Sequence, residues 1–96
     1  MPGVFYSARA LSDLDRLYDF LALNDPAAAL AVSAEILEAT AILERHPFIG
    51  RPTSENLREL VISRGRTGYV ALYRLVQEQD QVEILCIRHQ LEAGYI

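Results

Sequence analysis

The hydrophobic residues of this chain change their spacing once, at a loop rich in proline and glycine, and this change limits the folds that it can adopt. Before the loop, apolar side chains recur every three or four residues, which is the period of helices that bury one face. Beyond it they alternate with polar residues, which is the period of strands. The loop itself is His46-Pro47-Phe48-Ile49-Gly50-Arg51-Pro52. A helical first half and a sheet-forming second half follow.

The first half predicts a short strand and a helical hairpin. Val4-Phe5-Tyr6 is β-prone, and Ser7 after it is a good helix N-cap. The first helix is predicted from Ala8 to Leu23. Asn24-Asp25-Pro26 ends it and starts the second, because Asp caps a helix and Pro suits its first position. The second helix is expected to end near Arg45-His46, since the residue before a proline disfavours helix.

The second half predicts three strands, Leu57–Arg64, Tyr69–Val76 and Val82–His89, joined by turns at Gly65–Gly68 and Gln77–Gln81. Short turns favour a three-stranded antiparallel meander. The order β-α-α-β-β-β predicts an α+β fold in which the helices pack on one face of the sheet, as a single domain over residues 1–96. Alternation leaves open which face of the middle strand the helices cover.

Residues that recur at helical or strand periods should form the core. The predicted buried set is Leu14, Leu17, Ile36, Leu43, Leu72 and either Ile84 or Leu85, with Cys86 as a small core residue.

Composition excludes several classes of protein. A single cysteine rules out an intrachain disulfide and a thiolate zinc cluster, and with two histidines no metal site is expected. The first residues lack the pattern of a secretory signal, and no stretch was expected to reach the roughly 18 apolar residues that cross a bilayer. We therefore expect a cytoplasmic protein with no membrane partner, no metal and no cofactor.

Positive charge is concentrated in the middle of a chain whose net charge is −4. Residues 1–44 carry two Arg against seven acids, residues 45–76 six Arg against two acids, and residues 77–96 one Arg against four acids. All the basic residues are Arg, which suits bidentate recognition of carboxylate or phosphate, although a high-GC genome gives the same bias. An acidic chain is a poor general polyanion binder, since phosphate neutralisation dominates nucleic-acid affinity.

Three short patterns, in this order, resemble the RelE/ParE toxin superfamily. They are the Pro-x-x-Gly-Arg loop formed by Pro47, Gly50 and Arg51, the strand opening Leu57-Arg58-Glu59-Leu60, and the pair of strands containing Tyr69-Val70-Ala71-Leu72-Tyr73-Arg74 and Ile84-Leu85-Cys86-Ile87-Arg88-His89. The resemblance covers nearly the whole chain. It implies a type II toxin with a cognate antitoxin, and an oligomer of the two is expected.

The resemblance implies two lines of activity. ParE-like toxins poison DNA gyrase without being enzymes, whereas RelE-like toxins cleave mRNA on the ribosome. We favour gyrase inhibition with no catalytic residues, because the chain is net negative and has Val70 where the family often has Arg. The alternatives are a ribosome-dependent, metal-independent mRNA endonuclease and a homologue that binds its antitoxin but has lost toxicity.

For the nuclease alternative, the candidates for acid, base and phosphate contacts are His89, Tyr95, Arg58, Arg74 and Arg88. The competing interpretation is that His89 caps the last strand and Tyr95 anchors the tail. For target or antitoxin binding, the predicted residues are Arg51, Arg64, Arg66, Arg88, His89 and Tyr95, and the competing interpretation of the two turn arginines is a solvated turn.

Overall fold

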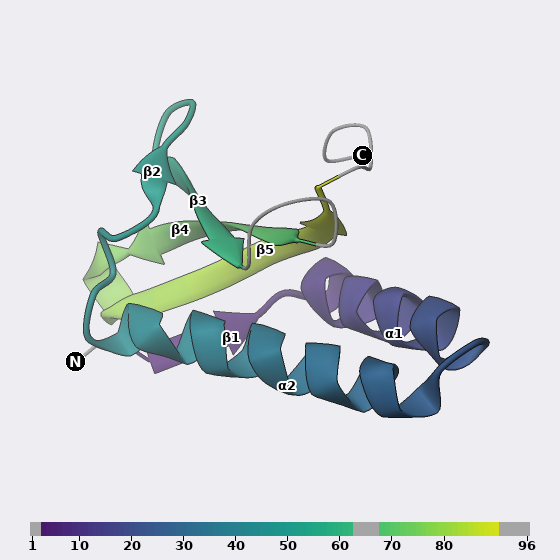
Figure 1. Cartoon of the computed structure of the whole chain (residues 1–96). Helices are drawn as coiled ribbons and strands as arrows, with labels where there is room; N and C mark the ends of the chain where they lie inside the picture. Colours follow the sequence, from purple (N-terminus) through teal and green to yellow (C-terminus); the bar gives the residue numbers. More distant parts are fainter. Residues whose placement is uncertain (1–2, 63–67, 91–96) are drawn as a thin grey trace.

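The chain folds into a mixed five-stranded sheet with a helical hairpin on one face (Figure 1). The computed structural model describes residues 3–62 and 68–90. Its elements are β1 (Gly3–Tyr6), α1 (Ala8–Ala22), α2 (Pro26–Ala41), the 3₁₀ turn η1 (Ile42–Glu44), β2 (Arg51–Pro52), β3 (Leu57–Ile62), β4 (Tyr69–Val76), the 3₁₀ turn η2 (Gln77–Gln79) and β5 (Gln81–His89). The predicted α+β class and its order of elements are confirmed.

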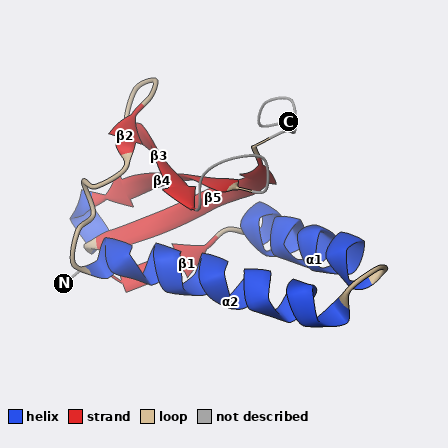
Figure 2. Cartoon of the chain, in the orientation of Figure 1, coloured by secondary structure: helices blue, strands red, loops and turns tan. Residues whose placement is uncertain are grey.

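Strand order in the sheet is β1-β5-β4-β3-β2. The antiparallel meander β3-β4-β5 was predicted and is present. Two edge strands extend it: β1 pairs parallel with β5, and the two-residue β2 pairs antiparallel with β3. Both helices lie on the same side of this sheet (Figure 2), where α1 contacts β5 and α2 contacts β3.

The helices begin where their capping residues predicted. The Ser7 hydroxyl accepts a hydrogen bond from the Ala10 N–H at 3.0 Å, and the Asp25 carboxylate accepts one from the Ala28 N–H at 3.1 Å. Each bond satisfies an amide that lacks a partner within the first helical turn. Pro26 occupies the first turn of α2, as expected.

The face of β4 that contains Tyr69, Ala71 and Tyr73 is buried in the main hydrophobic cluster, which settles the question that alternation left open. Leu17, Ile36, Leu43 and Ile84 are buried as predicted. The prediction was wrong for Leu14, which is half-buried and packs against the rim of the cluster, and for Leu72, which is half-buried. Leu72 alternates with the buried tyrosines, so its side chain lies on the other face of the sheet.

An irregularity in β5 determines which of its residues enter the core. The register between β4 and β5 shifts between Leu72 and Tyr73, so that Leu72 pairs with Cys86 and Tyr73 with Ile84. Leu85 is the extra residue of this bulge. Val82, Ile84 and Ile87 of β5 therefore belong to the main cluster, Cys86 is buried as predicted, and Leu85 stays half-buried.

The second half of β5 lies beyond the end of β1, and α1 supplies hydrogen bonds to its exposed edge. The Ser7 hydroxyl donates to the Leu85 carbonyl at 2.8 Å, and the Asp13 carboxylate accepts from the Ile87 N–H at 2.9 Å. Backbone groups at a sheet edge would otherwise offer a template to another strand. The side chains of Ser7, which caps α1, and of Asp13 within α1 thus bind the part of the edge that β1 leaves open.

Helix α2 is apolar around most of its circumference. Together with η1 it spans Pro26–Glu44, a segment long and apolar enough, by length and composition alone, to cross a membrane. The expectation that no such segment exists was therefore wrong. The core helix of a soluble protein passes the same test, and α2 here packs on α1 and the sheet.

Candidate functional site

The Pro-x-x-Gly-Arg loop is fastened to the sheet by one buried tyrosine. The Tyr73 hydroxyl donates to the Pro47 carbonyl at 2.8 Å and accepts from the Gly50 N–H at 2.9 Å. A Cβ at Gly50 would lie 2.6 Å from the Tyr73 ring and hydroxyl and 2.7 Å from the Glu59 carbonyl. Only glycine permits this close approach of loop and strand. The motif therefore positions Arg51 at the start of β2.

Burial gives Tyr73 a pH-dependent role in stability. Desolvation raises its pKa above the usual 10.0, against smaller opposing effects of the Gly50 hydrogen bond and the Arg58 charge. The folded state thus holds the phenol proton more tightly than the unfolded state. This stabilisation is complete below pH 10.0 and is lost as the pH rises through the folded pKa.

We therefore expect the free energy of unfolding to fall more steeply above pH 10.0 in the wild type than in Tyr73→Phe. Chemical denaturation of both proteins from pH 8 to about pH 11 measures the difference. Cys86, whose pKa burial also raises, is common to the two proteins and cancels in the comparison. If the free energies of unfolding of the two proteins fall in parallel as the pH rises, the stabilising role assigned to the buried Tyr73 phenol is wrong.

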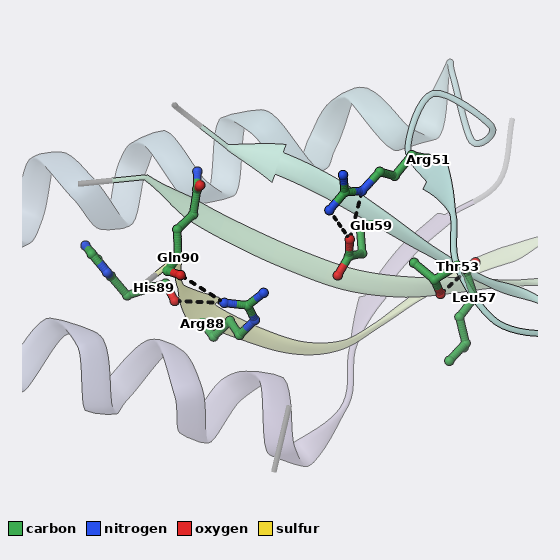
Figure 3. Close-up of polar contacts among 7 residues, drawn as sticks. All are labelled: Arg51, Thr53, Leu57, Glu59, Arg88, His89 and Gln90. Atoms are coloured by element: carbon green, nitrogen blue, oxygen red, sulfur yellow. Dashed lines mark hydrogen bonds and ion pairs between the residues drawn. The ribbon is translucent and has the colours of Figure 1, made fainter. Parts of the chain in front are cut away.

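Three arginines of the sheet make contacts with groups of the chain itself. Arg51 binds Glu59 with its Nε and a terminal nitrogen, at 2.9 and 2.7 Å (Figure 3). Arg74 binds Glu83 in the same two-point manner, at 2.8 Å for each nitrogen. Arg58 donates to the carbonyls of Phe48 and Gly50, at 3.0 and 2.7 Å. Planar guanidinium groups favour such two-point contacts.

Arg88 and His89 were predicted to act together at the end of β5, but their side chains point in different directions (Figure 3). Arg88 turns back and donates to the carbonyls of His89 and Gln90, at 3.2 and 3.3 Å. The His89 ring packs edge-on against Tyr69, a core residue, with ring centres 5.2 Å apart. This ring contact is a packing role that neither the catalytic nor the strand-capping interpretation of His89 had included. Arg64, Arg66 and Tyr95 lie outside the described residues, and the roles predicted for all these side chains stay predictions.

At the other end of the meander, Arg58 and Arg74 line one cavity of about 570 Å³. Phe48, which the sequence interpretation left as an ordinary loop residue, also lines it and stacks on Arg58, whose guanidinium carbon lies 5.0 Å from the ring centre. The sequence signal that could have identified Phe48 is an aromatic residue inside the Pro-x-x-Gly loop, ten residues before Arg58. Within residues 3–62 and 68–90, no three His, Cys, Asp or Glu side chains gather into a group that could hold a metal ion.

The outer surface of the helical hairpin is unusually apolar. The large hydrophobic side chains exposed there are Leu11, Phe20, Leu23, Leu30, Leu37 and Ile42, which we call the hairpin strip. Leu30 and Leu37 are seven residues apart and so lie on the same side of α2. Neighbouring exposed apolar side chains such as Leu30 and Leu37 make this side of α2 a candidate contact surface for a partner.

The family model that matches residues 4–94 is described as the ParE toxin of the type II toxin–antitoxin system parDE. The chain is 40% identical to Toxin RelE3 of Caulobacter vibrioides, over 96% of this chain and 98% of that protein. It is 35% identical to Toxin RelE1 of the same organism, over 93% and 94%.

Two solved structures are also similar. The chromosomal ParDE toxin–antitoxin system of P. aeruginosa superimposes with a TM-score of 0.79 at 26% identity, over 93% of this chain and 96% of that one. The RelBE2 toxin–antitoxin complex of Mycobacterium tuberculosis gives a TM-score of 0.66 at 26% identity, over 94% and 100%.

Proposed function

Because the chain belongs to the family of ParE toxins of type II toxin–antitoxin systems, we propose that its target is DNA gyrase. The chain is the toxin of such a pair and has a cognate antitoxin as its partner. The relatives named RelE and the family named ParE share one fold, so names do not decide between targets. The choice of gyrase depends on the chemistry of the candidate site.

One observation carries the proposal: three arginines of the sheet, among them Arg58 and Arg74 of the nuclease alternative, already make hydrogen bonds to groups of this chain. Arg51 and Arg74 each form an ion pair with a carboxylate, which offsets part of their charge, and Arg58 donates to two uncharged carbonyls. A ribosomal nuclease needs many unneutralised cations, because phosphate contacts supply most of the affinity for nucleic acid. The net charge of −4 likewise disfavours binding to nucleic acid. A protein target makes no such demand.

The packing of His89 supports a mechanism without acid–base catalysis. Its ring rests on Tyr69 on the core side of β5, whereas Arg88 alternates to the other face. A general base and the cation that would stabilise its phosphate should reach the same reacting group. We therefore infer that the surface around Arg88 contacts a protein.

The hairpin strip supports an antitoxin that covers the helices. Residues 1–44 carry seven acids against two Arg, so the covering segment should be apolar where it meets Leu30 and Leu37 and basic at its margins. The chain and its antitoxin are then expected to purify as one complex in the cytoplasm.

Two substitutions test the target. His89→Gln preserves size and hydrogen bonding but removes the imidazole, and it should leave growth arrest within about twofold of wild type, since no proton transfer is lost. Arg88→Glu should reduce arrest strongly by reversing charge at the contact surface. Growth after induction, gyrase supercoiling and DNA breaks, and mRNA cuts in an in-vitro translation reaction are measured together.

The control is Arg45→Glu, the same reversal at an exposed residue. Arg45 follows η1, which contacts β1 beside the start of β5, whereas Arg88 lies near the end of that strand. It should leave arrest unchanged. Ribosome-dependent cuts without DNA breaks, abolished by His89→Gln with the roughly 10²–10⁴-fold loss typical of a missing acid or base, would replace gyrase by the ribosome. A wild type inactive in both assays would identify a homologue without toxicity.

A further inference from the structure

A cavity of about 570 Å³ opens where β3 begins and β4 ends, at the far end of the sheet from Arg88 and His89. Its floor and walls come from the Phe48 loop, the turn that joins β2 to β3, and η2. The lining combines two arginines, Arg58 and Arg74, with the apolar side chains of Phe48, Leu57 and Leu75. This volume lies within the range of small-ligand and side-chain sites.

Both arginines are fixed before any ligand arrives. Arg58 is held by the Phe48 and Gly50 carbonyls through one terminal nitrogen, and its flat face stacks on the Phe48 ring. Arg74 is held by Glu83 through Nε and one terminal nitrogen. A guanidinium carries five N–H donors, so these bonds leave donors on each group. Side chains held in place lose little entropy on binding, which favours affinity.

The charges around the cavity select against a polyanion. Glu55 and Glu78 line it together with the two arginines, so the lining itself is neutral. Register places Arg58 opposite Tyr73 and Arg74 opposite Leu57, and neighbouring strand positions face opposite sides of the sheet. The arginines therefore reach the cavity from different sides.

We propose that this cavity binds a side-chain carboxylate on a peptide segment of a protein partner, with an apolar residue of that segment packed on Phe48 and Leu75. Arg58 and Arg74 both line this cavity, and the donors that each guanidinium has left can give a carboxylate charge-assisted hydrogen bonds. Peptide N–H groups, or a basic residue of the same segment, complement Glu55 and Glu78. The site lies apart from the hairpin strip and does not depend on which target the toxin has.

The test uses two capped dipeptides as probes, N-acetyl-Glu-Leu-amide and its uncharged match N-acetyl-Gln-Leu-amide. Titrated into the full-length ¹⁵N-labelled chain, the Glu peptide should shift the amide signals of Asn56, Leu57, Val76 and Gln77 with saturation, and bind at least about tenfold more tightly than the Gln peptide. Arg58→Gln and Arg74→Gln should each remove about tenfold of that affinity, whereas Arg16→Gln, on α1, should not.

Arg58→Gln also loosens the loop, so Arg74→Gln, whose side chain is half exposed on a strand, decides the result if the first variant melts early. Equal binding of the two peptides overturns the proposal. So does inorganic phosphate that produces the same shifts at lower concentration than the Glu peptide, because the site would then be a phosphate site. Calorimetry with the antitoxin identifies the source: weaker binding by Arg74→Gln assigns the carboxylate to the antitoxin, and unchanged binding assigns it to the target.

Discussion

Gly50→Ala should lower the free energy of unfolding by about 3 kcal/mol, the upper part of the range for overpacking a buried site. The added methyl group would sit 2.6 Å from the Tyr73 ring and hydroxyl, and 2.7 Å from the backbone carbonyl of Glu59. Backbone cannot move aside as a flexible side chain can, so the loop must leave the strand. Both hydrogen bonds of the Tyr73 hydroxyl to the loop would then be lost.

Thermal denaturation measures this effect, which corresponds to a fall in Tm of about 12–24 °C for a domain of this size. Gly3→Ala is the matched control. Its methyl group would meet only the far edge of the Phe5 ring, at 2.8 Å, and Phe5 is half exposed and free to turn. Tyr73→Phe in the Gly50→Ala background should restore little stability, because the clash with the Glu59 carbonyl persists. A Gly50→Ala protein that melts like the wild type would show that the loop does not pack this closely.

Ile36→Ala and Leu37→Ala form a neighbouring pair with opposite expected effects. Ile36 is 1% exposed and its truncation should cost about 2–5 kcal/mol of unfolding free energy, the usual range for a buried aliphatic side chain. Leu37 is 49% exposed, and its truncation should cost less than about 1 kcal/mol. Urea denaturation gives both values.

For antitoxin binding, the expected order of the two substitutions is reversed: Leu37→Ala should have the larger effect and Ile36→Ala the smaller. Leu37 belongs to the hairpin strip, so Leu37→Ala should weaken binding of the cognate antitoxin by about tenfold in calorimetry. Ile36→Ala, where folded, should change it little, because its side chain faces the sheet. Undiminished antitoxin affinity in Leu37→Ala combined with Leu30→Ala would show that the antitoxin binds elsewhere.

The helices and the meander could be predicted because their signals are local. Ser7 and the Asp25-Pro26 pair cap their helices within a few residues, and β3, β4 and β5 follow one another at short intervals in the sequence. The parallel pairing of β1 with β5 joins residues about 78 positions apart, and no local pattern encodes it. The bulge at Leu85 was equally invisible, because a register shift depends on both strands.

The candidate site was predicted as a set of arginines, but not as a set of contacts. Arg51 and Glu59 are eight residues apart, and Arg74 and Glu83 are nine apart, and only strand register brings each pair together. Because the sequence does not reveal the strand register, each of these arginines was interpreted as a cation available to a partner. Likewise, His89 was expected beside Arg88, whereas alternation along β5 sends the two side chains to opposite faces of the sheet.

The contacts that close the β5 edge also determine how early in synthesis this protein can complete its fold. Ser7 and Asp13 bind Leu85 and Ile87, and β1 pairs with β5, so the first of the described strands and the first helix find these partners in the last of the described strands to be made. Contacts between such distant residues form late, after local helix formation. A ribosome that stops before residue 81 would therefore leave a helical hairpin and an unpaired first strand. The toxin becomes a finished fold only when almost the whole chain exists.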